Sequence, residues 1–216
     1  MIKFLLIRHG ETFSNAEKRY AGHHDVGLTE KGIWQAEQLS KRLTEFPIKA
    51  IYSSDLKRAI HTATIVNKKH QLNLRIDPLL REINFGEWEG LCFEEIKNNH
   101  ENHSYWMCEP HLPLPGGESM SDFKKRVLSG LEKIIAEHVH GEECETVAIV
   151  CHGGVTRIII GNALNIPLDK LWFIKQDSTT LNIINYYKED IYFVETINDT
   201  NHLNINPILI EKDRTN

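Results

Sequence analysis

Three apolar runs in the 216-residue chain follow one plan, and this plan constrains the fold more than any other feature. Each run has the character of a buried strand, ends in a polar loop with a basic residue, and leads into a helical pattern. The three segments are Ile2 to Ile7 before Arg8-His9-Gly10, Ala50 to Ser53 before a helix with Arg58, and Val147 to Val150 before Cys151-His152-Gly153-Gly154. Continuous apolar strands separated by amphipathic helices are typical of a parallel sheet covered on both faces. We therefore expect an α/β fold, a three-layer α/β/α sandwich with a mostly parallel central sheet.

Two amphipathic helices are expected to pack on this sheet. Thr29 is a candidate N-cap for a helix whose apolar positions recur at helical spacing from Ile33 to Leu43. Ser121 is the corresponding candidate for a second helix, with apolar positions from Phe123 to Ile134.

The rest of the chain is expected to belong to the same domain, which would span residues 1–216. A stretch at about residues 91–120 breaks the strand and helix rhythm with several prolines, and it is predicted to be an inserted irregular or helical segment beside the site. Near the end, Thr180 to Ile184 and Ile191 to Val194 flank a polar turn, which predicts an antiparallel hairpin at the sheet edge. That edge leaves both a monomer and a homodimer open.

Composition excludes several classes of protein. The net charge of −5 argues against broad attraction to nucleic acid or to an anionic membrane surface. No stretch approaches the roughly 20 apolar residues of a membrane-spanning helix, and the amino terminus has no cleavage site typical of a signal peptide. The four cysteines form no CxxC pair. We expect a cytoplasmic protein.

The three basic loops are expected to converge. In open α/β sheets, ligands bind beyond the carboxyl ends of the strands. Arg8, His9, Arg58 and His152 would therefore meet at one edge of the sheet although they are far apart in sequence.

These side chains suit phosphoryl transfer. A phosphoryl group in transit spreads negative charge over its oxygens, so a catalyst needs cationic donors, a nucleophile in line and an acid for the leaving oxygen. Arg8 and Arg58 can bind phosphate oxygens, and His152 adds a third donor. The glycines of the Gly10 and Gly153-Gly154 loops are expected to let backbone N–H groups approach the phosphate.

His9 is the candidate nucleophile. A histidine ring can attack phosphorus while it is neutral, which requires that its other nitrogen be held by an acceptor. Taken alone, a histidine at a strand end is more often a satisfied core residue. The two further basic elements at other strand ends favour the catalytic interpretation.

Several blocks of sequence resemble the signature of the histidine phosphatase superfamily, also called the phosphoglycerate-mutase-like superfamily. Together they span residues 2 to about 185. The blocks are Leu6-Ile7-Arg8-His9-Gly10-Glu11-Thr12 with Asn15, Tyr20-Ala21-Gly22 with Asp25, Tyr52 to Ala59, Leu80 to Gly90, Pro115 to Ser119, and His152 to Arg157.

The resemblance implies a role for each candidate site residue. His9 would be phosphorylated, Arg8, Arg58 and His152 would hold the phosphoryl group, and Glu82 would protonate the leaving oxygen and later activate water. The resemblance also implies four residues that bind phosphate or substrate: Asn15, Ala21, Gly22 and Gly153. It implies no metal ion and no cofactor.

Glu82 has competitors for the acid role. An ion pair with Arg81 is the structural alternative, and Glu87 and Glu89 lie close to it in sequence. Glu11 and Glu118 are expected to orient loops rather than take part in the chemistry.

Two residues depart from the family pattern. Gly27 stands where proline is common, and Cys151 stands where serine or threonine often precedes the second histidine. Cys151 would be sensitive to oxidation if it were exposed at the pocket.

The segment from Glu82 to Gly90 and the modest length resemble the phosphatase branch, which includes alpha-ribazole phosphatases and broad-specificity bacterial phosphatases. The expected activity is hydrolysis of a small phosphorylated metabolite, with alpha-ribazole phosphate as one candidate. A cofactor-dependent phosphoglycerate mutase and a non-catalytic module that binds phosphorylated ligands remain alternatives. A metal-dependent hydrolase, prompted by histidines such as His23, His24, His100 and His103, lacks a matching ligand motif. Tyr105 and Trp106 of the inserted segment are candidates for contact with the substrate.

Overall fold

The computed structural model describes residues 1–99, 109–139 and 144–204. Its centre is a six-stranded sheet in the order β3-β2-β4-β1-β5-β6. The strands are β1 (Ile2–Arg8), β2 (Ile48–Ser53), β3 (Leu74–Ile76), β4 (Glu145–Cys151), β5 (Leu181–Tyr187) and β6 (Ile191–Asp199). The four strands β1 to β4 pair in parallel, whereas β5 pairs antiparallel with both β1 and β6. The expected mostly parallel sheet is therefore confirmed.

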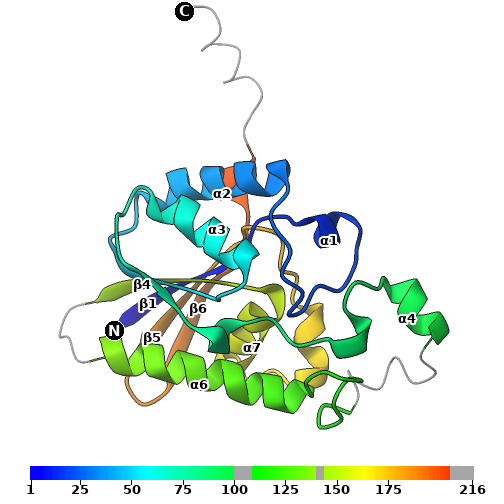
Figure 1. The fold of residues 1–216 in the computed structure, drawn as a ribbon. Coiled ribbons are helices and arrows are strands. Elements are labelled where there is room, and N and C mark those ends of the chain that lie inside the picture. Colours follow the sequence, from blue (N-terminus) through cyan, green and yellow to red (C-terminus); the bar gives the residue numbers. More distant parts are fainter. Residues whose placement is uncertain (100–108, 140–143, 205–216) are drawn as a thin grey trace, which may run out of the picture.

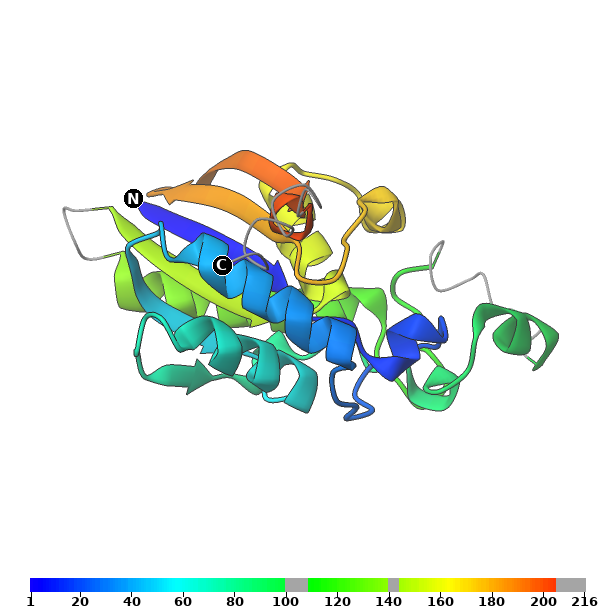
Figure 2. The same cartoon turned by 90° about the horizontal axis from the view of Figure 1, so that it is seen from above.

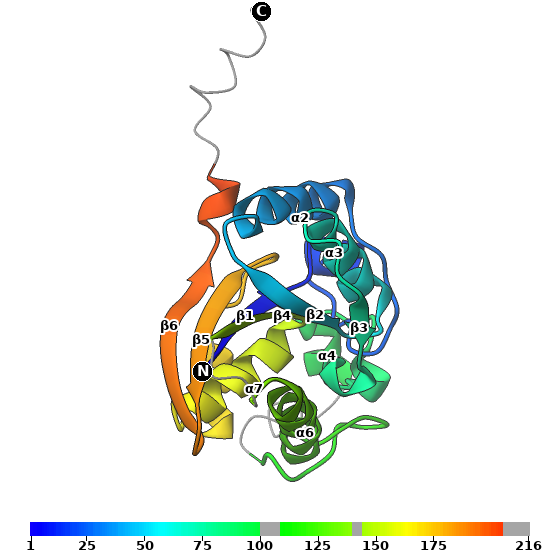
Figure 3. The ribbon, with the colours of Figure 1, turned by 90° about the vertical axis from the view of Figure 1, so that its left-hand side faces the viewer.

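Helices cover both faces of this sheet (Figure 3). One layer consists of α2 (Glu30–Leu43) and α3 (Lys57–Asn67), and the other of α6 (Met120–His138) and α7 (Gly153–Ala163). The remaining helices are α1 (Phe13–Ala16), α4 (Phe93–Asn99) and the short 3-10 helices η1 (Pro78–Leu80), η2 (Gly86–Trp88), η3 (Leu168–Phe173) and η4 (Asn201–Leu203). The three-layer sandwich predicted from the sequence is confirmed.

Strand β1 shows why these residues form a central strand. Its side chains alternate between two buried clusters, because successive residues of a strand point to opposite faces. Phe4 and Leu6 pack in the cluster with α6 and α7, while Leu5 and Ile7 pack in the cluster with α2 and α3. Both faces of β1 are therefore inside the protein.

The helix caps agree with the sequence in one case and correct it in the other. The Thr29 hydroxyl accepts a hydrogen bond from the backbone N–H of Gly32 at 3.0 Å and caps α2, as predicted. Helix α6 begins at Met120, and its N-cap is Ser119, which accepts from the N–H of Asp122 at 3.0 Å. The prediction of Ser121 was wrong by two residues, because Ser119 has the extended backbone of a cap whereas Ser121 is already in the first turn.

The carboxy-terminal hairpin is confirmed and is longer than predicted, since β5 and β6 extend to Tyr187 and Asp199. Strand β6 forms one edge of the sheet and β3 the other. Strand β3 was not predicted from the sequence, because it has only three residues, all partly or fully exposed, and so shows no apolar run. The organisation of the chain as one domain stays a prediction.

Candidate active site

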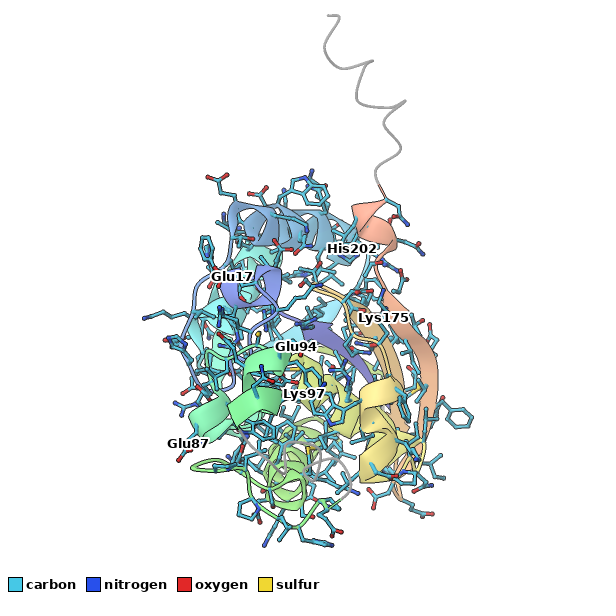
Figure 4. The ribbon with its side chains drawn as sticks, turned by 90° about the vertical axis from the view of Figure 1, so that its right-hand side faces the viewer. Glu17, Glu87, Glu94, Lys97, Lys175 and His202 are labelled. Atoms are coloured by element: carbon cyan, nitrogen blue, oxygen red, sulfur yellow. The ribbon has the colours of Figure 1, made fainter. Side chains whose placement is uncertain are left out.

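The candidate site lies at the carboxyl ends of β1, β2 and β4, which are neighbours in the sheet. His9 follows β1 and His152 follows β4, and the backbone N–H of His9 donates to the carbonyl of Cys151 at 2.9 Å. Arg58 lies in the first turn of α3, directly after β2. Helices α1 and α4 lie beyond this end of β1 (Figures 1 and 2). Figure 4 looks onto the same end, where Glu94 and Lys97 of α4 are labelled.

The His9 ring is held in one tautomer. Its Nδ1 lies 2.7 Å from the carbonyl oxygen of Gly10, and a carbonyl can only accept, so Nδ1 carries the hydrogen and Nε2 keeps its lone pair. Burial lowers the pKa of His9 well below its ordinary value, and the positive charges of Arg58 and Arg8 lower it further. The ring is therefore neutral near pH 7, as a nucleophile must be.

His152 and Arg58 form a buried pair of donors. Arg58 Nε donates to His152 Nδ1 at 3.3 Å, so the hydrogen of the neutral His152 ring is on Nε2. Burial, followed by the charge of Arg58, lowers the pKa of His152 well below its ordinary value. Within the described part of the chain, His152 Nε2 is buried without a hydrogen-bond partner. It is a donor that a bound ligand can satisfy.

Arg8 is held from the side of β5, which lies on the other side of β1 from β4. Its Nη1 donates to the backbone carbonyl of Gln176 at 2.6 Å. The Gln176 side chain exchanges two hydrogen bonds with Asn182 of β5, at 3.0 and 2.9 Å. Arg8 Nε is buried with no acceptor among the described residues. The guanidinium is thus fixed by the backbone and keeps a donor for a ligand.

Glu82 lies at the amino-terminal end of α7. Its Oε2 accepts from the N–H of Gly154 at 2.9 Å, and its Oε1 accepts from the N–H of Ile83 at 3.0 Å. These two N–H groups hold the carboxyl group in place. A Cβ at Gly154 would lie 2.1 Å from Glu82 Oε1, so only glycine allows the carboxyl group to sit there.

The alternatives to Glu82 have other roles. Arg81 pairs with Asp55, with contacts of 2.7 and 2.5 Å, rather than with Glu82. Glu87 is exposed. The carboxylate of Glu89 accepts from loop N–H groups and holds residues 22–24.

Gly22 is required by this loop. Its φ is +46°, and a Cβ there would lie 2.2 Å from Glu89 Oε1. The two oxygens of Glu89 accept from the N–H groups of His23 and His24, each at 2.6 Å. The carbonyls of Gly22 and His24 in turn accept from Arg58, at 2.6 and 2.9 Å. The loop therefore orients Arg58.

Asn15 closes a capping box in α1. The Thr12 N–H donates to Asn15 Oδ1, and the Asn15 N–H donates to the Thr12 hydroxyl, both at 3.2 Å. Because Oδ1 is committed, Nδ2 is the atom with which Asn15 can donate to a ligand.

These groups surround a cavity of about 300 Å³. Its lining includes five cationic side chains and, among the described residues, one acidic side chain, Glu82. The cations are Arg8, Lys18, Arg19, Arg58 and Arg157. Ala21, Gly22, Gly153 and Asn15 also line it. His152 is fully buried and is not part of this lining, but its ring lies 5.1 Å from the ring of His9, centroid to centroid. The cavity is suited to an anion although the chain as a whole carries a net charge of −5.

Part of this cavity lining was not predicted from the sequence. The lining residues that were not predicted as site residues are Lys18, Arg19, Tyr20, Phe85, Phe93, Arg157 and Trp172. Arg157 carried a usable signal, because it lies four residues after Gly153 and therefore on the same face of α7. Trp172 of η3 carried none, since it comes from a segment without a motif.

The structure corrects the expectation for two glycine N–H groups. The Gly10 N–H donates to the Thr62 hydroxyl at 3.0 Å, and the Gly154 N–H donates to Glu82. Neither is available to a phosphate. Gly10 is needed for a different reason, because a Cβ there would lie 2.4 Å from the carbonyl oxygen of Gly32.

The other predicted loop-orienting acids lie outside the cavity. Glu11 forms an ion pair with Lys31 at 2.7 Å and accepts from the Thr29 hydroxyl at 3.1 Å. Glu118 accepts from Arg126 at 2.7 Å and from the Asn84 N–H at 2.8 Å.

Cys151 is fully buried, and burial raises the pKa of its thiol, so the condition for its oxidation at the pocket is not met.

Two further expectations concern metal binding and the inserted segment. Among residues 1–99, 109–139 and 144–204, no group of three or more histidine, cysteine or acidic side chains could hold a metal ion. His100, His103, Tyr105 and Trp106 lie outside the described residues. None of the described helices has the length and apolar character needed to cross a membrane.

Comparison with known proteins gives close relatives. The chain is 33% identical over 178 residues to the adenosylcobalamin/alpha-ribazole phosphatase of Escherichia coli, covering 82% of this chain and 86% of the relative. It is 32% identical over 205 residues to phosphoserine phosphatase 1 of Hydrogenobacter thermophilus, covering 94% and 95%. The structure of YhfR from Bacillus stearothermophilus superposes with a TM-score of 0.85 at 35% identity, covering 94% of this chain and all of that one.

Other relatives are longer, and the chain spans 55% of the length of three mycobacterial proteins that it matches, which include the bifunctional protein Rv2228c of Mycobacterium tuberculosis. The family match itself extends over residues 4–200. It includes β1, β2 and β4 together with the loops that carry His9, Arg58 and His152. The chain belongs to the histidine phosphatase superfamily, branch 1.

Proposed function

We propose that the chain is a phosphomonoesterase that transfers the phosphoryl group of a small phosphorylated metabolite to His9 and then to water. The observation that carries this proposal is the hydrogen bond from His9 Nδ1–H to the Gly10 carbonyl. It leaves the Nε2 lone pair on a neutral ring beside a cavity lined by five cationic side chains.

In the first step, His9 Nε2 attacks phosphorus and the bond from phosphorus to the ester oxygen breaks. The negative charge on the phosphoryl oxygens is stabilised by Arg8, Arg58 and the Nε2–H of His152. Two of these groups have buried donor atoms without partners in the described chain, Arg8 Nε and His152 Nε2. Phosphoryl oxygens would satisfy both.

Glu82 is the proposed proton donor and acceptor. Its carboxyl group would give a proton to the leaving oxygen. In the second step it would take a proton from the water that attacks phosphorus, the bond to Nε2 breaks, and inorganic phosphate leaves. The position of Glu82 at the cavity wall supports this role. Asn15, Ala21, Gly22 and Gly153 are the proposed contacts to the phosphate or substrate.

The relatives support a phosphatase activity, but their names point to more than one substrate. One is named an alpha-ribazole phosphatase and another a phosphoserine phosphatase, with nearly equal identity to this chain. We propose that this chain, too, hydrolyses such a small ester, and that it needs no metal ion.

The test is phosphate release in the presence of chelator from alpha-ribazole phosphate, phosphoserine, a sugar phosphate, an aryl phosphate and 3-phosphoglycerate. We expect turnover of at least one ester, and His9→Ala should reduce it by at least about 10³-fold. The matched control is His61→Ala, since His61 is an exposed histidine of α3, and full activity is expected. Mass spectrometry of acid-sensitive phosphate on the wild type, absent in His9→Ala, would identify the intermediate.

Three results would contradict the proposal. Loss of activity in chelator would indicate a metal-dependent hydrolase. Isomerisation of phosphoglycerate that depends on a bisphosphoglycerate primer would indicate a mutase. Binding of all esters without turnover would indicate a binding module.

A further inference from the structure

Arg157 has no role in the proposed mechanism, yet it lines the cavity. It lies in α7, and its Nε donates to the carbonyl of Ile174 at 2.8 Å. The guanidinium lies over the ring of Trp172, 4.9 Å from the ring centroid. One nitrogen of the guanidinium and an aromatic face therefore fix its orientation, and Nη1 and Nη2 are left to other partners.

No carboxylate of the described chain lies within ion-pair distance of Arg157. Arg81 and Arg126, which do not line the cavity, have such partners in Asp55 and Glu118. Arg157 is partly buried, and this burial lowers its pKa to about 10. An unpaired and partly desolvated cation is costly in free energy. Such a cation in a cavity wall is suited to an anion that arrives with the ligand.

The position of Arg157 indicates which part of the ligand it meets. A Cβ built on Gly153 would lie 3.0 Å from Arg157 Nη1 and 3.4 Å from Arg8 Nε, so both guanidinium groups lie against Gly153. The charge of Glu82 acts on all three arginines, Arg8, Arg58 and Arg157. Arg8 and Arg58 are also the cations that lower the pKa of His9, and Arg157 is not among them. Since Glu82 would protonate the leaving oxygen and Arg157 does not act on His9, Arg157 lies on the leaving-group side of the phosphoryl site.

We propose that Arg157 binds a carboxylate on the leaving group, so that the preferred substrates are phosphate esters of small hydroxy acids. This inference rests on the proposed function and names its substrate class. The planar guanidinium matches a carboxylate with two parallel hydrogen bonds, and Trp172 holds the plane in place. A cavity of about 300 Å³ suits a small ester of this kind.

The test compares substrates that differ only in the carboxylate. Phosphoserine is paired with phosphoethanolamine, and 3-phosphoglycerate with glycerol phosphate. In the wild type we expect the acid of each pair to have the higher kcat/KM. Arg157→Gln should lower kcat/KM for the acids by about 10- to 100-fold, mainly through KM, and change the other esters by less than about 3-fold.

Two further variants refine this result. Arg157→Lys keeps the charge but loses the second parallel hydrogen bond, so it should fall between the wild type and Arg157→Gln. Lys175→Gln is the matched control, because Lys175 is a cation of the same end of the molecule (Figure 4) that pairs with Asp177 and does not line the cavity. It should leave the preference for acids unchanged.

Equal losses on both members of each pair would overturn the inference, because Arg157 would then contact the phosphoryl group or only support the fold. A second comparison uses the ratio of kcat/KM for fructose 1,6-bisphosphate to that for fructose 6-phosphate. If this ratio exceeds the ratio for each acid and its paired ester without the carboxylate, Arg157 binds a second phosphate group rather than a carboxylate, and the inference is wrong. Thermal unfolding of each variant separates these results from misfolding.

Calorimetric binding separates this inference from the proposed function. In a His9→Ala background, the affinity for 3-phosphoglycerate should exceed that for glycerol phosphate, and Arg157→Gln should remove the difference. This result would stand even if no ester were hydrolysed. Equal affinities in the His9→Ala protein would contradict the inference even if hydrolysis were observed.

Discussion

The cavity and a second cluster, which is partly exposed, both gather charged groups around a histidine, but they use their hydrogen bonds in different ways. The second cluster, called the Tyr52 cluster, consists of Tyr52, Arg75, Glu137, His138 and Glu145. The Tyr52 hydroxyl contacts Glu137 at 2.7 Å, Arg75 at 2.5 Å and His138 Nε2 at 3.0 Å. Arg75 also pairs with Glu137 at 2.6 Å, and His138 Nδ1 lies 2.6 Å from Glu145.

The Tyr52 cluster therefore supplies a partner within the protein for each of its members. The cavity does not, since His152 Nε2 and Arg8 Nε have no partner in the described chain and the cations outnumber the acids five to one. Buried polar groups are almost always paired in folded proteins. Unpaired buried donors that cluster around one cavity indicate where a ligand completes the structure, whereas a closed cluster indicates a contribution to the fold.

The largest expected difference between the cavity and the Tyr52 cluster is in kcat, when His152 or His138 is replaced by alanine. His152→Ala removes the Nε2–H donor and should lower kcat by about 10²- to 10³-fold. His138→Ala should leave kcat within about 3-fold and lower the free energy of unfolding by about 1–3 kcal/mol, because Tyr52 and Glu145 lose a partner. Steady-state kinetics and urea unfolding measure both. Comparable losses of kcat in the two variants would contradict the assignment of the cavity to catalysis and of the Tyr52 cluster to stability.

A methyl group at Gly154 should disturb the cavity without changing any charge. The added Cβ would lie 2.1 Å from Glu82 Oε1, so the carboxyl group must move away from the site of proton transfer. We expect Gly154→Ala to lower kcat by about 10²-fold. Gly27→Ala is the control, since no atom lies within 4 Å of a Cβ there, and full activity is expected. Unaltered kcat in a folded Gly154→Ala protein would argue against Glu82 as the proton donor.

The smallest expected effect is a gradual loss of protein stability as the pH falls. Burial lowers the pKa values of His9 and His152 below those of the unfolded chain, so the unfolded state binds more protons as the pH falls through about 6.5. The free energy of unfolding should therefore decrease below that pH, by at most about 1.4 kcal/mol per pH unit for each histidine. Urea unfolding at several pH values measures this, and His9→Asn should reduce the slope. An unchanged slope in that variant would contradict a neutral buried His9.

Much of the fold could be predicted because its signals are local. The apolar runs of β1, β2 and β4 and the Thr29 cap of α2 depend on residues a few positions apart. Strand β3 could not be predicted, because its three residues are partly or fully exposed and form no apolar run. Ser119 and Ser121 are both plausible caps in sequence, and only the backbone conformation distinguishes them.

The candidate site was predictable in its members but not in its details. Arg8, His9, Arg58 and His152 stand at the ends of apolar runs, and the order β2-β4-β1 brings them together. The sequence left Glu82 in competition with Glu87 and Glu89, and the contact of Glu82 with α7 places its carboxyl group, and neither of the other two, in the cavity lining. The Gly10 N–H, expected to meet phosphate, is occupied by Thr62, which lies 52 positions away in the chain.

The sequence by itself determined which segments form strands and which residue types stand at their carboxyl ends, because periodicity and motifs are written in neighbouring positions. The tertiary structure decided which nitrogen of His9 and of His152 carries the hydrogen, which donors remain unpaired, and that Arg157 and Trp172 share the cavity wall. The physical reason is that protonation, burial and pairing depend on groups from distant segments, and these meet only when the sheet and its two helical layers are assembled.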